Sequence, residues 1–124
     1  MSTGAAVADR PFEGPAAVPE TFRALSDPVR CAIVKHLGTR SEVTVNELAA
    51  LFPITLQAVS KHIKVLALAG VVTQRTEGRH RPVSLRAEAI LQASTWLDRR
   101  RRELAEQFAR LDDLLVELQE GGQQ

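Results

Sequence analysis

The sequence predicts a mostly α-helical fold with one small β-hairpin, and three observations support this prediction. Apolar residues recur at three- and four-residue spacings along most of the chain, which is the period of an amphipathic helix. Threonine, aspartate, proline and glycine interrupt this pattern where helices are expected to begin and end. Only residues 71–85 alternate apolar and polar side chains around a glycine, as a two-stranded hairpin does.

Length and composition indicate a single soluble domain. The chain has 124 residues, of which 44% are hydrophobic and 25% charged, as is usual for a globular protein. No apolar run approaches the roughly 18–20 residues of a membrane span, and the N-terminus lacks the pattern of a signal peptide. The lone Cys31 cannot form an internal disulfide. We therefore expect a cytoplasmic protein with no membrane partner.

The net charge of +1 conceals an uneven distribution. Residues 55–86 hold six Lys or Arg and the single acid Glu77, so this segment carries +5 and the rest of the chain −4. Positive charge gathered on one structural unit is typical of a surface that faces DNA. A solvated face with chance clustering is the alternative interpretation.

Proline and glycine bound the first helices. Residues 1–18 are rich in Ala, Gly and Pro without an apolar period, so we expect a disordered tail there. Pro19 starts a short helix, and Asp27 caps a second helix that opens at Pro28 and ends at Gly38. Two apolar residues share one face of the first helix, Phe22 and Leu25. The second helix has four residues at core spacing, Val29, Ile33, Val34 and Leu37.

Two further helices follow, separated by a tight break. Thr44 and Glu47 form a capping box, in which each side chain satisfies a free backbone N–H at the helix start. This helix runs through Leu51 and stops at Pro53, because the residue before a proline avoids the helical region. Thr55 caps the next helix. Three residues form its buried stripe, Val59, Ile63 and Leu66.

A basic hairpin comes next. Gly70 ends the preceding helix, strands are expected at residues 71–76 and 80–85, and residues 77–78 form the turn. Pro82 is excluded from a central strand, so its strand is expected at a sheet edge. Helix, break, helix and basic hairpin are the order of a winged helix-turn-helix, which places one helix in the major groove of DNA.

A long helix is expected over residues 87–119. Apolar residues recur there every seven positions, at Ile90, Leu97, Leu104, Leu111 and Leu118. Phe108 and Leu115 widen this stripe, whereas Arg100 and Arg101 interrupt it and argue against a continuous two-stranded coiled coil. So small a domain cannot cover so long a stripe, and we expect a second subunit to do so. Packing within its own chain is the alternative.

The chain resembles the ArsR-type (arsenic-repressor-like) family of bacterial winged-helix transcriptional regulators. Five segments carry the resemblance: FRALSDPVR at residues 22–30, IVKHL at 33–37, VNELA at 45–49, AVSKHIKVL at 58–66 and AGVV at 69–72. The resemblance implies a homodimer built from the first and last helices, and repression through a palindromic operator in double-stranded DNA. The expected dimer interface comprises Phe22, Leu25, Ile90, Leu97, Leu104, Phe108, Leu111 and Leu115.

Four parts are expected along the chain: a tail of residues 1–18, a DNA-binding domain of residues 19–86, a dimerisation helix of residues 87–120 and a tail of residues 121–124. The candidate DNA contacts lie on the helix that Thr55 caps and on the hairpin. The helix provides Thr55, Gln57, Ser60, Lys61, His62 and Lys64, and the hairpin provides Arg75, Arg79, His80 and Arg81.

The residue types in this set suit DNA in different ways. Gln bonds an adenine edge, Lys reaches guanine or a phosphate, and Thr55 suits a phosphate because helix N-termini attract anions. Arginine at a hairpin tip follows the backbone or enters a narrow minor groove. His62 either bonds a phosphate or orients a neighbour, and a packing role is equally open. Leu56 either touches a thymine methyl or packs inward. A solvated surface is the alternative for the helix face and for the hairpin.

Four arginines at residues 99–102 are flanked by Asp98, Glu103 and Glu106. These acids are placed to pair with the arginines at helical spacing, so we interpret the run as a solvated or intersubunit face. Contact with DNA or another partner is the alternative.

No metal or cofactor is expected. Metal-sensing members of the family use thiolate pairs near the third helix, or His and carboxylate ligands on the last helix. Here residues 45–52 lack cysteine, and residues 87–124 lack both histidine and cysteine. A lone thiol such as Cys31 is most often a small buried hydrophobe.

Two other functions stay open at this point: a sensor switched by a small molecule or by Cys31 oxidation, and a protein–protein module without DNA binding. An enzyme is not expected, because the chain lacks a phosphate loop and a nucleophile–base pair.

Overall fold

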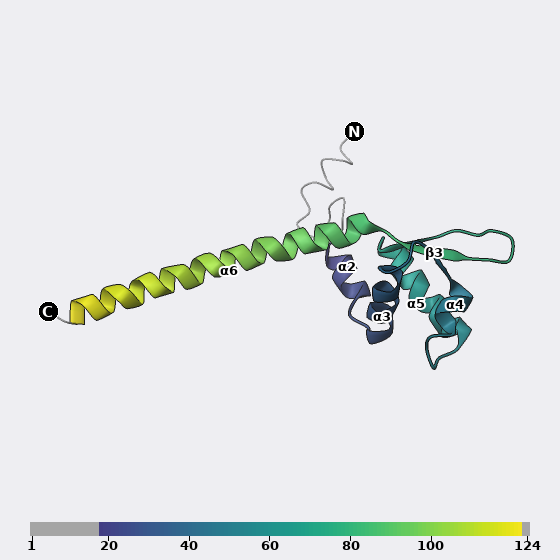
Figure 1. Cartoon of the computed structure of the whole chain (residues 1–124), viewed down its shortest axis with the longest axis horizontal. Helices are drawn as coiled ribbons and strands as arrows, with labels where there is room; N and C mark the ends of the chain where they lie inside the picture. Colours follow the sequence, from purple (N-terminus) through teal and green to yellow (C-terminus); the bar gives the residue numbers. More distant parts are fainter. Residues whose placement is uncertain (1–17, 123–124) are drawn as a thin grey trace, which may run out of the picture. The chain divides into compact units, whose positions relative to one another are not determined.

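The computed structural model describes residues 18–122, and the chain divides at Ala93 into two compact units. Eight elements follow one another: α2 (Val18–Ala24), α3 (Pro28–Leu37), β1 (Val43–Thr44), α4 (Val45–Ala49), α5 (Leu56–Leu68), β2 (Val72–Gln74), β3 (Pro82–Leu85) and α6 (Ala87–Gly122) (Figure 1). The expected N-terminal tail lies outside the described residues, except that α2 already includes Val18. The mostly helical fold with a small wing is confirmed.

The predicted caps of α3 are confirmed. The Asp27 carboxylate accepts a hydrogen bond from the Arg30 N–H at 3.0 Å, Pro28 opens the helix, and Gly38 is its C-cap. Ile33 and Leu37 are buried, while Val29 and Val34 pack against the core from its edge.

Helix α4 begins as expected but ends sooner. The capping box of Thr44 and Glu47 is complete. The predicted end at Pro53 is wrong, because the helix stops at Ala49 and the chain continues as single turns, with the Leu51 N–H bonding the Leu48 carbonyl at 3.0 Å. The N–H groups of Leu51 and Phe52 bond carbonyls three residues back instead of four, so the chain tightens and leaves the α-helix before it reaches Pro53.

The buried stripe of α5 forms the centre of the core. Val59, Ile63 and Leu66 are fully buried, and they pack with the buried residues of α3, α4 and the sheet. Gly70 follows α5 in the left-handed region at φ +79°. The Val71 N–H then bonds the Leu66 carbonyl at 2.9 Å, which is the Schellman ending that a glycine permits.

The sheet differs from the predicted hairpin by one strand. Strand β1, which the sequence did not reveal, pairs with β3, so the order is β1-β3-β2 and β3 is central. The edge position expected for the strand of Pro82 is therefore wrong. Pro82 is tolerated because it is the first residue of β3, opposite Thr44. The two strands of the hairpin are also shorter than expected.

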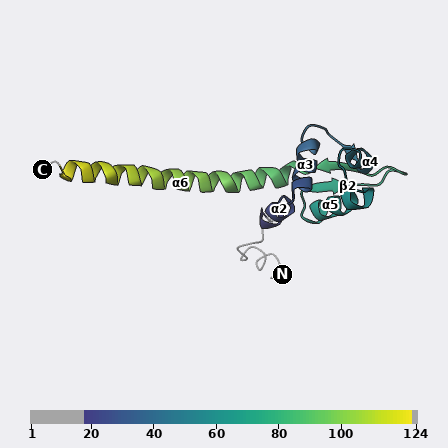
Figure 2. The same ribbon diagram turned by 90° about the horizontal axis from the view of Figure 1, so that it is seen from below.

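The turn of the hairpin lies one residue later than predicted. The N–H and carbonyl groups of Glu77 and His80 bond each other at 2.9 and 2.8 Å, so Gly78 and Arg79 occupy the two turn positions. Gly78 has φ +59°, a backbone conformation that such tight turns require and that glycine adopts without strain. We call residues 72–85 the wing; its hairpin extends beyond the helices around it (Figures 1 and 2).

Helix α6 is a little longer than expected, because Gly121 and Gly122 belong to it; residues 123–124 lie outside the described part. Ala89 and Ala93 are buried, and Ile90 packs against the core. Every described residue from 101 onward is exposed. Each helix within residues 18–122 is either too short or too polar to span a membrane.

Candidate nucleic-acid interface

Helix α5 presents a polar face opposite its buried stripe. Gln57, Lys61 and Lys64 are exposed, and Ser60 is half-buried. Thr55 begins the helix, and its hydroxyl oxygen accepts the Ala58 N–H at 3.1 Å. Its hydroxyl proton remains available to a phosphate at this helix N-terminus. The face expected to meet DNA is thus open along its length.

A hollow of about 260 Å³ lies where α4, α5 and the wing meet. Its lining residues are Thr44, Val45, Asn46, Leu56, Ser60, Arg79 and Arg81. The hollow brings Ser60 of the helix together with two arginines of the wing, although the sequence separates them by about twenty residues. We call the exposed face of α5, this hollow and the wing together the basic surface.

Asn46 is a member of this surface that the sequence reasoning missed. It is exposed at the first turn of α4 and lines the hollow. Its amide can donate and accept hydrogen bonds, so it suits either a base edge or a phosphate. One feature of the sequence could have indicated Asn46: it lies within the Thr44–Glu47 capping box, at the start of the helix that precedes α5.

Leu56 also lines the hollow and is 43% exposed. Its side chain is therefore not packed fully inward, and it stands at the first turn of α5. An apolar side chain there is placed to meet a thymine methyl group.

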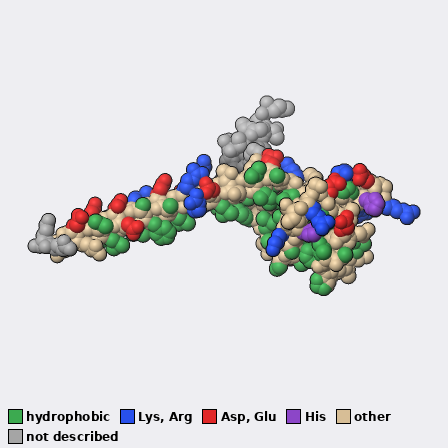
Figure 3. All heavy atoms as spheres, in the orientation of Figure 1, with side chains coloured by type: hydrophobic (Ala, Val, Ile, Leu, Met, Phe, Trp, Pro, Cys, Tyr) green, Lys and Arg blue, Asp and Glu red, His purple; other side chains and the backbone are tan. Residues whose placement is uncertain are grey.

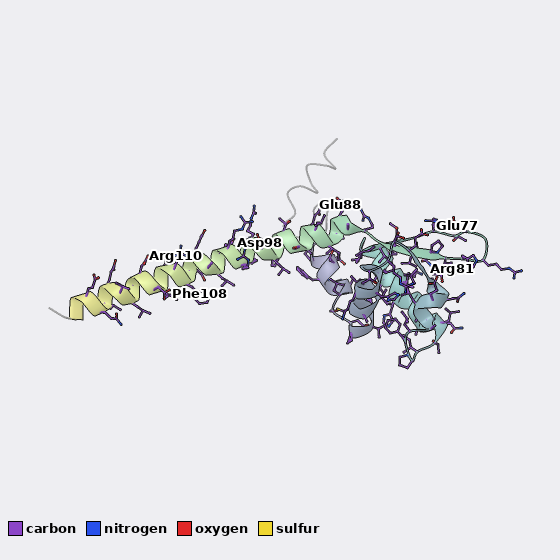
Figure 4. All side chains as sticks on the ribbon, viewed as in Figure 1. Glu77, Arg81, Glu88, Asp98, Phe108 and Arg110 are labelled. Carbon is purple, nitrogen blue, oxygen red and sulfur yellow. The ribbon has the colours of Figure 1, made fainter. Side chains whose placement is uncertain are left out.

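The far end of the wing carries strong positive charge. Arg79 occupies the turn itself, and His80 and Arg81 follow it immediately before β3; all three are exposed. Figure 3 shows Lys or Arg side chains at the tip of the hairpin, and Figure 4 labels Glu77 and Arg81 on it.

Arg75 has a different environment from the other wing arginines. It forms an ion pair and a hydrogen bond with Glu42, which lies 33 residues earlier, and a second ion pair with Glu77 at 3.3 Å. These carboxylates raise the pKa of the Arg75 guanidinium above its usual value. The ion pair with Glu42 ties the wing to the segment before β1. Because two acids offset its charge, Arg75 is less available to an anion.

His62 lies beside the start of α3. Its Nδ1 is 3.3 Å from Arg30 Nη1 and 3.8 Å from the Asp27 carboxylate, and its side chain is 23% exposed. Arg30 also donates through Nε to the Ala24 carbonyl at 2.6 Å. The pKa of Asp27 is held below its usual value, first by the hydrogen bond from the Arg30 backbone and then by the charge of His62. This network favours an orienting role for His62.

The remaining candidates lie elsewhere. Phe22 and Leu25 are half-buried, whereas Leu97, Leu104, Phe108, Leu111 and Leu115 are all more than half exposed. Cys31 is exposed, and its thiol donates to the Leu25 carbonyl at 2.8 Å. Among residues 18–122, no three His, Cys, Asp or Glu side chains could share a metal ion.

Three of the four arginines in the run on α6 pair with acids at helical spacing, as the sequence indicated. Asp98 bonds both Arg101 and Arg102 at 2.8 Å, and Arg100 bonds Glu103 at 2.9 Å. Arg100 also lies over the ring of Trp96, 4.9 Å from its centroid. The hydrogen bond from Arg101 lowers the pKa of Asp98 most, followed by the hydrogen bond from Arg102. Two carboxylates thus offset part of the positive charge of the four arginines.

Comparisons with known proteins agree with this geometry. A family model described as a helix-turn-helix domain matches residues 25–75. The uncharacterized HTH-type transcriptional regulator YuzN of Bacillus subtilis is 36% identical over 75 residues, which cover 56% of this chain and 82% of that protein. The HTH-type transcriptional regulator Rv2034 of Mycobacterium tuberculosis is 38% identical over 78 residues, covering 63% and 72%. The crystal structure of an ArsR family transcriptional regulator superposes with a TM-score of 0.66 at 33% identity, covering 76% of this chain and 95% of that one.

Proposed function

The chain belongs to the ArsR family of helix-turn-helix transcriptional regulators, and we propose that this DNA-binding regulator is a homodimeric repressor of a palindromic operator. The single observation that carries the proposal is the basic surface, where the open face of α5 and the arginines of the wing meet around one hollow. The relatives are transcriptional regulators and not enzymes.

In the proposed complex, α5 enters the major groove as the recognition helix. Gln57, Ser60 and Lys61 face base edges, while Lys64 reaches a base or a phosphate. Thr55 binds a phosphate at the helix start, and Asn46 adds a second contact from α4. His62 keeps the helix at its angle through Arg30.

The wing contributes most of the sequence-independent affinity in this proposal. Arg79, His80 and Arg81 lie along the phosphate backbone or enter the adjacent minor groove, where positive charge releases condensed counterions. Arg75 supports the wing from its base because Glu42 and Glu77 already hold it.

The proposed palindromic site and the exposed stripe of α6 both support a dimer. A palindromic site needs two recognition helices related by a two-fold axis. The apolar stripe of α6 is exposed in the single chain, with Leu97 and Leu104 each more than half accessible, and a second copy would cover it. In this proposal residues 19–86 read DNA, residues 87–120 hold the dimer together, and bound protein blocks transcription from the promoter it occupies.

Selection of bound fragments from random DNA by the purified full chain tests the proposal. An inverted repeat with half-sites about one helical turn apart is expected. Enrichment of a single unrepeated half-site would reject the dimeric reading, and no enrichment at all would reject sequence-specific regulation. A matched Lys61→Ala, Lys64→Ala protein should enrich its targets poorly, which ties the selected sequence to the basic surface.

A further inference from the structure

The Nδ1 atom of His62 lies between two groups of opposite charge. It is 3.3 Å from Arg30 Nη1 and 3.8 Å from the Asp27 carboxylate. Arg30 and Asp27 both belong to the start of α3, whereas His62 lies in the middle of α5. The His62 side chain is 23% exposed, so protons from solvent can reach it. One ring atom therefore has two possible partners on the same neighbouring segment.

The protonation state of the ring decides which partner it can use. A guanidinium only donates hydrogen bonds, so Nδ1 accepts from Arg30, and the one proton of the neutral ring lies on Nε2. A second proton binds at Nδ1, which can then only donate, and the ring becomes a cation 3.3 Å from another cation. The acceptor within ion-pairing distance is the Asp27 carboxylate. The pKa of Asp27 is held low, first by the Arg30 backbone hydrogen bond, so this carboxylate is charged where histidines ordinarily titrate.

We infer that His62 is a proton-operated switch between α3 and α5: the neutral ring accepts a hydrogen bond from Arg30, and the protonated ring donates to Asp27 instead. The exchange needs one proton from solvent and no other reactant, because Nε2 keeps its own proton in both states. It is reversible, and each state satisfies Nδ1 with the partner that its proton count allows.

The ring has few other charged neighbours. Helix α5 packs against α2, α3, α4 and β2, and β2 carries no charged residue. The remaining charged or titratable side chains on these helices either have contacts of their own, lie at the far end of α3, or are exposed. They are Glu20 and Arg23 of α2, Cys31, Lys35 and His36 of α3, Glu47 of α4, and Lys61 and Lys64 of α5. Asp27 and Arg30 are therefore the charged groups that respond to the state of the ring.

The exchange of partners changes how α5 is held. Arg30 stays with α2 and α3, because its Nε donates to the Ala24 carbonyl at 2.6 Å. When the ring turns from Arg30 to Asp27, α5 loses its tie to this arginine and shifts against α3. The consequence for DNA rests on the proposed function: a shifted recognition helix fits the operator less well, while the added positive charge favours any sequence. Protonation therefore lowers the preference for the operator over random DNA.

A double-mutant cycle in the full chain tests the exchange without DNA. Wild type, Arg30→Met, His62→Ala and the double variant are unfolded with urea at about pH 8 and about pH 5.5, on either side of the ordinary histidine pKa. The two side chains should stabilise each other at the higher pH, and this coupling should be lost at the lower pH. Equal coupling at both pH values would overturn the inference.

Nitrogen NMR of the imidazole rings tests the same exchange in the wild-type chain, where no substitution can disturb folding. The His62 signals are assigned by their loss in His62→Asn. At the higher pH they should show a protonated Nε2 and a bare Nδ1, and at the lower pH both nitrogens should carry protons. A proton on Nδ1 at the higher pH would overturn the inference, because Arg30 would then have no acceptor there.

The variant His62→Asn tests the consequence for DNA. The Asn side-chain oxygen stands close to the place of Nδ1 and can accept from Arg30 at every pH. From the higher to the lower pH, the ratio of operator affinity to random-DNA affinity should fall at least about fivefold in wild type and stay constant in His62→Asn. The matched control is His36→Asn, outside the proposed contact set, which should retain the fall. A fall of equal size in His62→Asn would overturn the switch. Absence of operator binding at both pH values would remove the proposed function and leave the exchange to the urea and NMR measurements, which decide it alone.

Discussion

Arg30 points its Nη1 at the Nδ1 of His62 across 3.3 Å, and so connects the start of α3 to the middle of α5. Because Arg30 also donates to the Ala24 carbonyl, the contact joins three elements: α2, α3 and α5. In the proposed complex, the angle at which α5 meets DNA therefore depends on residues that need not touch DNA at all.

His62→Ala should lower stability and affinity together. Removal of the imidazole leaves a half-buried arginine N–H without its partner, which costs about 1–2 kcal/mol in the free energy of unfolding. Urea unfolding measures this loss, and a titration with operator DNA measures the accompanying weakening. Lys35→Ala, on the exposed side of α3, is the control and should change neither. Full stability in the His62 variant would refute the orienting role.

The Asp27 cap should make stability depend on pH in the acid range. Its pKa is lowered in the folded chain, first by the Arg30 backbone hydrogen bond. The cap's charge-dependent contribution is therefore complete above the ordinary carboxyl pKa of about 3.9, and it is lost as the pH falls through the lowered folded value. Asp27→Asn keeps an acceptor without the charge. The difference in unfolding midpoint between wild type and variant should be constant near neutrality and shrink below about pH 4; a difference that grew instead would contradict this assignment.

Lys61→Ala or Lys64→Ala should weaken operator binding by about 1–3 kcal/mol if the lysine reads a base. A lysine that contacts only phosphate should instead weaken all sequences equally and reduce the salt slope by about one unit. Fluorescence titrations with operator and scrambled duplexes at several salt concentrations separate the two cases. Unchanged affinity in both variants would remove these residues from the contact set.

The wing arginines should not behave alike. Arg79→Ala and Arg81→Ala should each reduce the salt slope by about one unit, because neither has an acid partner among the ion pairs of the described residues. Arg75→Ala should change the slope less, since Glu42 and Glu77 already neutralise that guanidinium, while loosening the base of the wing. The same titrations apply, and an equal loss of slope in all three variants would show that Arg75 also meets DNA.

Truncation after Ala93 should produce a monomer with an intact DNA-reading unit. The fragment keeps the buried Ala89 and Ala93, and it loses a part of α6 in which no described residue is buried. Circular dichroism should show a cooperative thermal transition, and light scattering should give the mass of one chain. A stable dimer from this fragment would refute the role proposed for the rest of α6.

Features that depend on neighbouring residues could be predicted from the sequence. Asp27, Thr44 and Thr55 cap helices as expected, and the stripe from Val59 to Leu66 is fully buried. Capping and helical periodicity act within about one turn, so the chain shows them locally. The polar face of α5 could be predicted from the same stripe, because the residues on the opposite side of the helix remain exposed.

Features that join distant segments could not be predicted in this way. Strand β1 has only two residues, and it pairs with β3 about forty residues later. Glu42 forms an ion pair with Arg75 in the same region of the fold. The surface formed by residues 55–86 is therefore less positive than their own net charge of +5 indicates. Asn46 joins the hollow because β1 and β3 bring the start of α4 beside the wing. Local patterns carry no information about these pairings.

The most direct measurement of the central claim is the affinity of the full chain for its selected operator, compared with a duplex carrying one scrambled half-site and with random DNA, at physiological salt. Paired basic surfaces predict binding at least about a thousandfold tighter to the intact operator than to random DNA, a large loss when one half-site is scrambled, and a steep fall with added salt. Equal affinity for all three duplexes would contradict the account.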